Sequence, residues 1–273
     1  MEIQVLGPLS AHVNGVSIVP SAGKPRQLLA LLAFYPGRVL PVPTLMEEIW
    51  GTGMPPSAMT TMQTYILQLR RRLGTAMGPD APGGAKEVLA TRHGGYVLQI
   101  APDSVDVHRY EQLVAAGQSA SDDGDDERAA QVLRQALGMW QGPAVVDVRV
   151  GPVLEIEVLR LEESRLVTVE RRVDADLRLG RHAELLAELT DLMARHPQHE
   201  GLHAQAMVAL YRSGRQATAL DVYRRLRGRL IEELGVEPSP QLQRLHQAML
   251  TVDPALDQLC GARRTSTFDL YTV

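Results

Sequence analysis

The sequence predicts a mainly α-helical protein with a small amount of β structure in its first hundred residues. Two observations on the 273-residue chain lead to this fold class. The hydrophobic period changes several times before residue 100, as it does where short strands alternate with helices, whereas the pattern beyond residue 104 is helical almost throughout. Within the helical part a segment recurs after 34 residues, a spacing typical of helical-hairpin repeats.

The composition is that of an ordinary globular protein. Hydrophobic residues make up 45% of the chain and charged residues 22%. The first residues, MEIQVLGPLS, lack a basic region followed by an apolar core, and no apolar run approaches the roughly 18 residues of a membrane span. The single cysteine, Cys260, allows neither a disulfide framework nor a cysteine-based zinc site. We therefore expect a cytoplasmic protein with no membrane partner.

The chain begins with two stretches that predict short strands. They are residues 2–9 (EIQVLGPL) and residues 11–19 (AHVNGVSIV). Asn14-Gly15 within the second stretch is a strong signal for a tight turn, because both residues tolerate a positive φ angle.

Three helices follow these strands. KPRQLLALLAFY (24–35) predicts a helix with Pro25 near its first turn, and VPTLMEEIW (42–50) predicts a second one, stopped by the glycine- and proline-rich stretch after it. Ser57 is a candidate N-cap for the third helix, which we expect to end at Gly74.

A strand, a turn and a second strand complete the first hundred residues. KEVLATRHGGYVLQI (86–100), after a polar loop at 74–85, predicts this hairpin with its turn at residues 93–95. Residues 1–100 carry a net charge of +3 and the rest of the chain −7. Such an uneven split suggests that the first part binds a polyanion.

The helical part contains a repeat. LRLGRHAELLAEL (177–189) aligns with YRSGRQATALDVY (211–223), and the alignment places Gly180 and Gly214 at equivalent positions. The period belongs to tetratricopeptide-like helical hairpins, in which small residues let paired helices approach closely. We interpret DERAAQVLRQALGMW (126–140) as a degenerate earlier unit.

The third predicted helix has one apolar face. At 100° per residue its large apolar side chains fall within about 60° of arc, and we expect this stripe to be buried. The stripe consists of Met62, Ile66, Leu69 and Leu73, with Tyr65 on its margin.

The opposite face of that helix carries hydroxyl, amide and guanidinium groups. It has no carboxylate between residues 57 and 77, although a solvated face usually mixes Glu with Lys. Glutamine can pair with adenine, threonine can pack on a thymine methyl, and arginines can bind the phosphate backbone. Both a DNA-recognition surface and a helix end solvated by its cations fit this face. Its polar members are Thr60, Thr61, Gln63, Thr64, Gln68, Arg70, Arg71 and Arg72, and Leu67 is an apolar exception.

The neighbouring elements favour DNA recognition. Two helices joined by a short break and followed by a basic hairpin are the order of a winged helix-turn-helix domain. Arg92 at the tip of the hairpin is placed to enter or flank a minor groove. Lys24 and Arg26 open the first helix, where charge and free backbone amides could anchor a phosphate.

The order of these motifs resembles a known family. LGPL, NG, KPRQLLALL, LMEEIW, TTMQTYILQLRRRLG and GGYVL, followed by Asp106 and YEQLV, resemble the Streptomyces antibiotic regulatory protein (SARP) family. Its members pair an OmpR-type winged helix with a bacterial transcriptional activation domain. We accordingly expect a winged-helix DNA-binding domain at 1–100, a bacterial transcriptional activation domain of helical repeats at 101–250 and a flexible tail at 251–273.

The resemblance also implies a function and partners. It implies an activator of a secondary-metabolite (antibiotic) gene cluster that binds direct repeats in double-stranded promoter DNA as a head-to-tail homodimer. RNA polymerase holoenzyme, through its sigma factor and alpha C-terminal domain, is the second implied partner. By analogy the loop between the second and third helices contacts polymerase with Gly51, Thr52, Gly53, Met54 and Ser57. Because the sequence has no G-x-x-x-x-G-K-[ST], we expect no nucleotide cofactor and no enzymatic activity.

Two motifs suggest metal sites. HEGLH (199–203) matches the H-E-x-x-H motif of zinc proteases, but Gly201 weakens a helix there and no third ligand has a compelling spacing. DDGDDE (122–127) suggests a calcium loop, but Arg128 stands where that loop needs glycine. We therefore expect a structural helix start for HEGLH, a solvated helix start for DDGDDE and no metal at either.

Both tryptophans, Trp50 and Trp140, are interpreted as packing residues, and Cys260 is interpreted as incidental. A different function also fits the helical repeats, namely a scaffold that binds proteins without binding DNA.

Overall fold

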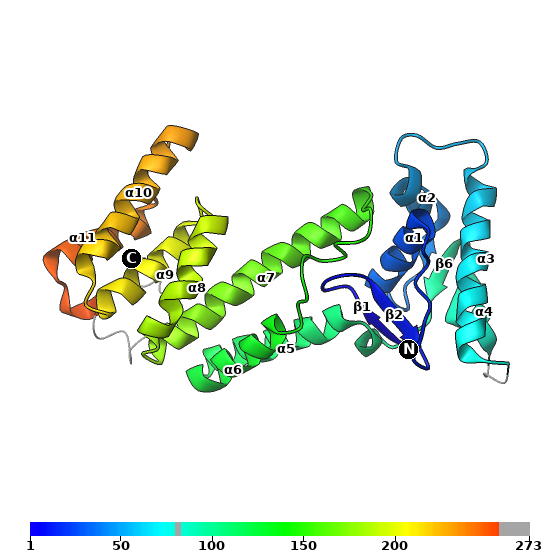
Figure 1. Cartoon of the computed structure of the whole chain (residues 1–273), viewed down its shortest axis with the longest axis horizontal. Coiled ribbons are helices and arrows are strands. Elements are labelled where there is room, and N and C mark those ends of the chain that lie inside the picture. The colour runs from blue at the N-terminus through cyan, green and yellow to red at the C-terminus, as the bar shows by residue number, and fades with distance from the viewer. Residues whose placement is uncertain (80–82, 257–273) are drawn as a thin grey trace. The chain divides into compact units, whose positions relative to one another are not determined.

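The computed structural model describes residues 1–79 and 83–256, and it is mainly α-helical with two small sheets (Figure 1). The chain divides into two compact units, of which the first comprises residues 1–113 and 136–165. The second comprises residues 114–135 and the chain from residue 166 onward. Three helices contribute residues to both units: α5 (Asp106–Asp122), α6 (Asp126–Leu137) and α7 (Pro152–Arg178). No helix within the described ranges is long and apolar enough to cross a membrane.

The first sheet is an antiparallel meander of β1 (Glu2–Gln4), β2 (Ser10–Val13) and β3 (Val16–Ser17). The predicted turn is confirmed, since Asn14 and Gly15 take φ angles of 51° and 78°. The first strand is shorter than the prediction of residues 2–9. It ends early because the amides of Val5 and Leu6 donate to the carboxylate of Asp106 instead of to a neighbouring strand.

Three helices form the core of the predicted DNA-binding domain: α1 (Gly23–Phe34), α2 (Val42–Trp50) and α3 (Ala58–Met77). Ser57 occupies the predicted N-cap position of α3, but its side chain makes no capping hydrogen bond. The predicted end at Gly74 is wrong. The helix continues because Ala76 is buried and its carbonyl accepts a hydrogen bond from Asn14, and Gly78 at φ 85° ends it.

The wing is a second antiparallel sheet of β4 (Leu40–Pro41), β6 (Gly95–Leu98) and β5 (Leu89–Arg92), in that order. Strand β4 was not predicted. Residues 84–88, in part predicted as strand, form the short helix α4 (Gly84–Val88). The strand pairing ends at Leu89 and Leu98, with one further bond from the amide of Gln99 to the carbonyl of Val88, and the helix contacts α3 instead. The chain turns into a 3₁₀ helix, η1 (Pro102–Ser104), soon after.

Residues 136–165 join the winged helix within the first unit. The amides of Gln141 and Val145 donate to the carbonyls of Leu6 and Val5, extending the backbone pairing beyond residue 100. Near the end of α1, Tyr35 donates its hydroxyl to Glu157 over 2.6 Å. Burial, with this bond adding to it, raises the pKa of Tyr35 to about 12.

The second unit continues through α8 (His182–Arg195), α9 (Glu200–Arg212), α10 (Gln216–Leu234), α11 (Pro240–Thr251) and η2 (Pro254–Leu256). The predicted repeat is confirmed in its turns. Gly180 and Gly214 take φ angles of 80° and 73°. The amide of the next residue, Arg181 or Arg215, donates to a carbonyl five residues back in both turns.

The degenerate earlier unit has the same turn. Gly124 takes a φ angle of 79°, and the amide of Asp125 donates to the carbonyl of Ala120. The prediction about close approach needs a correction, because the aligned alanines Ala183 and Ala217 are exposed. The small residues between α5, α6 and α7 are instead Ala120, Ala129, Ala130 and Ala175.

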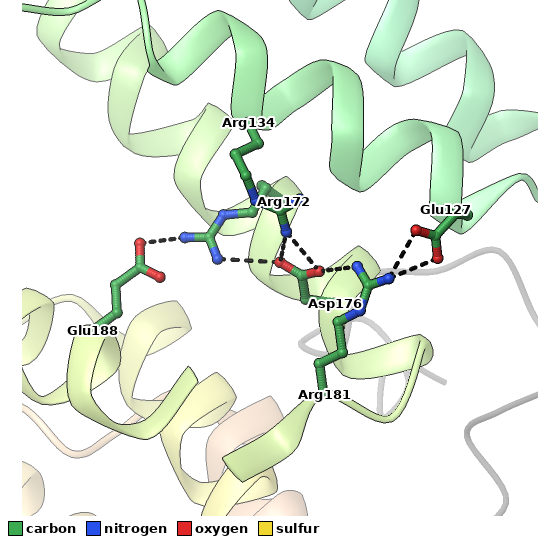
Figure 2. A network of polar contacts seen from close by, with 6 residues as sticks. All are labelled: Glu127, Arg134, Arg172, Asp176, Arg181 and Glu188. Carbon is green, nitrogen blue, oxygen red and sulfur yellow. Dashed lines mark hydrogen bonds and ion pairs between the residues drawn. The ribbon is translucent and has the colours of Figure 1, made fainter. Parts of the chain in front are cut away.

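A buried carboxylate connects α6, α7 and the turn before α8. Asp176 is 2% exposed and accepts from the guanidinium groups of Arg134, Arg172 and Arg181, as Figure 2 shows. Glu188 pairs with Arg172 at one end of this network, and Glu127 pairs with Arg181 at the other. Three cations around one buried carboxylate compensate its charge.

The two motifs that suggested metals have structural roles. His199 caps α9 by accepting from the amide of Leu202, and Glu200 accepts from the amide and hydroxyl of Ser239. His203 is buried, and burial lowers its pKa. The acidic segment begins α6, where Asp126 pairs with Arg178.

Part of the predicted flexible tail, with Cys260, lies outside the described residues. Both tryptophans pack on tyrosines: Trp50 stacks on Tyr65, and Trp140 meets Tyr110 edge-on.

Candidate nucleic-acid interface

Helix α3 buries the predicted stripe and exposes the predicted polar face. Met62, Ile66, Leu69 and Leu73 are at most 2% exposed. Because these four side chains hold the helix against the rest of the unit, the opposite face is turned to solvent. That face exposes Thr60, Gln63, Thr64, Gln68, Arg71 and Arg72, and Thr61 lies half-buried at its edge. Leu67 is 48% exposed among them.

The three consecutive arginines of α3 have different surroundings. Arg70 is half-buried and reaches the wing, where its Nε donates to the carbonyl of Leu89 and its Nη2 to the hydroxyl of Thr91. Arg72 donates to the carbonyl of Val19 over 3.2 Å. Arg71 is exposed and has no hydrogen-bond or ion-pair partner within the described part of the chain. Of the three, Arg71 therefore has the guanidinium that is most available to a ligand.

A basic cleft lies along the last turns of α3. It has a volume of about 560 Å³ and is formed by Gln68, Arg71, Arg72 and Thr75 on one side. The segment before α1 forms the other side, with Ser17 and residues 20–22. Two guanidinium groups among hydroxyl and amide groups, with no carboxylate in the lining, are suited to bind a phosphate.

The two basic residues at the start of α1 differ in whether the protein engages their charge. Lys24 is exposed, and its Nζ lies 5.0 Å from the centre of the Trp50 ring, a cation–π contact that leaves the ammonium accessible. Arg26 is half-buried and engaged by the protein, since Nη1 pairs with Asp147 at 3.0 Å and Nε donates to the carbonyl of Pro20. Lys24 is therefore available to a ligand, whereas Asp147 compensates the charge of Arg26.

Arg92 lies at the tip of the wing. It closes strand β5 opposite Gly95, next to a turn in which His93 and Gly94 have φ angles of 33° and 78°. Its side chain is exposed, and its only hydrogen bond among the described residues is a 3.5 Å contact to the neighbouring carbonyl of Thr91. Arg92 can therefore reach a ligand beside the wing.

The predicted polymerase loop connects α2 to α3 over Gly51–Ser57. Gly51 has a φ angle of 55° and Gly53 donates its amide to the carbonyl of Trp50, so the loop starts with a tight turn. Thr52, Met54 and Ser57 are exposed, and Met54 is 48% exposed. An apolar tip of this kind is available to a protein partner.

The structure adds residues that the sequence interpretation missed. Tyr65 and Trp50 have ring centres 6.3 Å apart with 15° between their planes, so they link α3 to the end of α2. The helical periodicity had placed Tyr65 only on the margin of the buried stripe. No sequence signal joined it to Trp50, because the pairing depends on how α2 and α3 pack.

Comparison with protein families finds two matching models. Residues 19–98 match the model described as "Transcriptional regulatory protein, C terminal". Residues 105–250, more than half of the chain, match the "Bacterial transcriptional activator domain".

Several proteins are similar to the chain over nearly its whole length. Regulatory protein DnrI of Streptomyces peucetius is 53% identical over 258 residues, which cover 94% of this chain and 95% of DnrI. Transcriptional regulator RedD of Streptomyces coelicolor is 36% identical, with 94% of this chain and 72% of RedD covered. Regulatory protein AfsR of Streptomyces coelicolor is 40% identical over 94% of this chain, which spans only 25% of AfsR.

A solved structure has the same fold. Mycobacterium tuberculosis EmbR, determined in complex with a low affinity phosphopeptide, matches with a TM-score of 0.86 and 31% sequence identity. The match covers 95% of this chain and 68% of the EmbR chain.

Proposed function

Because the chain belongs to the Streptomyces antibiotic regulatory protein family of transcriptional regulators, we propose that it activates transcription by binding specific promoter sequences of an antibiotic biosynthetic gene cluster. One observation carries the proposal: the exposed face of α3 is lined by hydroxyl, amide and guanidinium groups without a carboxylate, and an exposed arginine lies at the tip of the adjacent wing. Such a face is complementary to a major groove and its phosphates.

The polar residues of α3 are assigned to base recognition. Gln63 and Gln68 can pair with adenine, and Thr64 can contact a base through its methyl group, since its hydroxyl donates to the carbonyl of Thr60. We assign Leu67 an apolar contact with a thymine methyl, because its side chain is exposed on the same face.

Some of the basic residues bind DNA in this proposal, and the others hold elements of the protein in place. Arg71 and Arg92 contact the DNA backbone or groove, with Lys24 beside them as a phosphate contact. Arg70 holds the wing against α3 through Leu89 and Thr91, so it sets the angle between the two DNA-reading elements. Arg26 supports the start of α1, and Arg72 supports the segment before it while lining the same cleft as Arg71.

The partners proposed here are those that the family resemblance implies. Two copies bind direct repeats head to tail, and the α2–α3 loop, with Gly51, Thr52, Gly53, Met54 and Ser57, contacts RNA polymerase holoenzyme. The relatives named as transcriptional regulators support this proposal, as does the exposure of Met54 in the loop.

The variant Arg71→Ala tests the proposal on candidate promoters. If Arg71 binds a phosphate, the variant weakens binding on every sequence and lowers the magnitude of the negative slope of log K against log salt by about 0.9. If it reads guanine, the loss is about 1–3 kcal/mol and limited to one base position. Gel shifts on promoter variants at several salt concentrations distinguish the two.

Arg128→Ala is the matched control, because Arg128 is exposed on α6 and its replacement removes the same charge. Binding that Arg71→Ala leaves unchanged would remove Arg71 from the interface. A wild-type protein that gives no promoter footprint and binds partners independently of salt would instead support the protein-binding scaffold.

A further inference from the structure

We propose that Arg149, which lies outside the predicted winged helix in the segment before α7, binds the DNA sugar-phosphate backbone together with Lys24. The inference rests on the proposed DNA-binding function and extends its interface. Arg149 belongs to the part of the chain that matches the activator-domain model, so the contact gives that part a direct role in holding DNA.

The two cations share a cleft within the first unit. Its volume is about 530 Å³, and it is formed by the start of α1, the end of α2 and residues 149–152. Lys24 comes from α1, Trp50 and Gly53 from the end of α2 and the loop after it, and Arg149 from the segment before α7. Three parts of the chain that are distant in sequence therefore face one hollow.

The cleft keeps a positive charge. Its one carboxylate, Glu48, is 2% exposed, and both of its oxygens accept from backbone amides or from Gln27. Arg149 is exposed and has no hydrogen-bond or ion-pair partner among residues 1–79 and 83–256. Lys24 lies over the Trp50 ring with its ammonium accessible. An anion entering the cleft would meet two cations that are not engaged in an ion pair, and the oxygens of the one carboxylate are already occupied by amide donors.

The cleft adjoins the DNA-reading face. Its wall, Trp50, stacks on Tyr65 of α3, which is within one helical turn of Thr61 and Gln68. The start of α1 also separates this cleft from the one that contains Arg71, because residues 20–22 line one cleft and Gly23 and Lys24 line the other. Available cations thus follow one another from Arg71 past Lys24 to Arg149.

A phosphate backbone fits this row better than a single small anion. Its charges are evenly spaced along a strand, so one strand can meet the cations of both clefts that flank the start of α1. The polar side chain that could read a base edge in the cleft, Gln27, is buried and donates to Glu48. The contact should therefore contribute affinity equally on all sequences.

The test compares full-length Arg149→Gln with the wild type on an operator and on a scrambled duplex of the same length. The plot of log K against log salt has a negative slope, and the magnitude of this slope should fall by about 0.9 on both duplexes, as expected when one phosphate contact is lost. Hydroxyl-radical footprinting should show that protection is lost at one flanking part of the backbone, while protection opposite α3 remains. Arg149→Lys should restore most of the slope, because a phosphate contact requires charge and not a particular donor geometry.

Arg128→Gln removes the same charge from α6 and serves as the control. The proposal is wrong if Arg149→Gln keeps the wild-type slope and footprint, or if Arg128→Gln lowers the slope equally. It is also wrong if Arg149→Gln lowers promoter activity without changing DNA binding, a result that would indicate an acidic protein partner. None of these results changes the footprint of the wild-type protein on the operator. The proposed function would therefore stand even if the inference about Arg149 failed.

Discussion

Carboxylates that receive backbone amides connect the sequence-distant parts of the first unit. Glu48 accepts from the amides of Gly151, Val153 and Leu154 at 2.7–2.9 Å, so a side chain of α2 caps the start of α7. Asp106 accepts from the amides of Val5 and Leu6, which follow strand β1. A negative charge at a helix start meets free N–H groups and the positive end of the helix dipole, which makes these bonds stronger than neutral ones.

The variant Glu48→Gln should lower the free energy of unfolding by about 2 kcal/mol, because one acceptor oxygen becomes an amide donor facing backbone N–H groups. Urea denaturation measures the change. The control is Glu47→Gln, since Glu47 is the adjacent, exposed residue of α2 and should change stability by less than about 0.5 kcal/mol. Equal stability of the Glu48 variant and the wild type would show that water replaces the lost bonds.

The carboxylate of Glu170 predicts a pH dependence of stability. Burial, followed by the nearby Asp174 carboxylate, raises the pKa of Glu170 to about 7. A raised pKa means that the folded state holds a proton which the unfolded state releases at lower pH. The free energy of unfolding therefore falls as pH rises from the usual glutamate pKa to about 7. Above about pH 7 the loss of stability caused by ionising Glu170 no longer changes with pH.

Glu170→Gln should consequently be more stable than the wild type by about 2 kcal/mol at pH 8 and nearly equal to it at pH 4.5. Urea midpoints at the two pH values measure the difference. Glu163→Gln, an exchange at an exposed position of the same helix, controls for the change in charge. A stability difference that does not vary with pH would contradict the raised pKa.

At the scale of elements, the turns of the repeat set its register as much as the helices do. Leu185 and Leu189 of α8 are buried, and so are Ala219 and Tyr223 of α10, 34 residues later in each case. The left-handed glycine ends one helix and starts the next in the same register, so the buried faces recur at the same interval.

Gly214→Ala should destabilise the protein by about 1 kcal/mol, because a left-handed residue with a Cβ is strained. No atom lies within 4 Å of the added Cβ, so the effect comes from the backbone alone. Gly228→Ala is a matched exchange inside α10, also without a neighbour within 4 Å, and it should stabilise by about 0.5–1 kcal/mol. Thermal denaturation measures both, and two changes of the same sign would refute this explanation.

At the scale of the whole molecule, the first compact unit includes residues beyond 100. The amides of Val5 and Leu6 depend on Asp106, the amide of Leu9 depends on Asp147, and Glu48 depends on the start of α7. A fragment that ends at residue 100 loses all of these partners and leaves Glu48 without its backbone amide donors.

The fragment 1–100 should therefore be less stable than the same part of the full chain by at least about 2 kcal/mol. Trp50 fluorescence in urea reports the unfolding of this part, and full-length Trp140→Phe is the reference because it leaves Trp50 as the one tryptophan. Equal urea midpoints for the two proteins would mean that residues 101–165 contribute no stability to the winged helix.

Most of the fold could be predicted from sequence because its signals are local. Periodicity identified the buried stripe of α3, Asn14-Gly15 identified a turn, and the spacing of Gly180 and Gly214 identified the repeat. The errors occurred where a distant contact decides the outcome. Residues 84–88 form the helix α4, which contacts α3, and the end of α3 is set by the burial of Ala76.

The sequence by itself determined which residues are chemically suited to DNA: a helix face without acids, a basic hairpin and the family to which the chain belongs. Only the tertiary structure decided which of those cations are available. Asp147 engages Arg26, the wing engages Arg70, and Arg71 keeps an exposed guanidinium, while Arg149 joins Lys24 from 125 positions away. The reason is physical, since charge and periodicity are properties of the chain, whereas the compensation of a charge depends on which groups folding brings within a few ångströms of it.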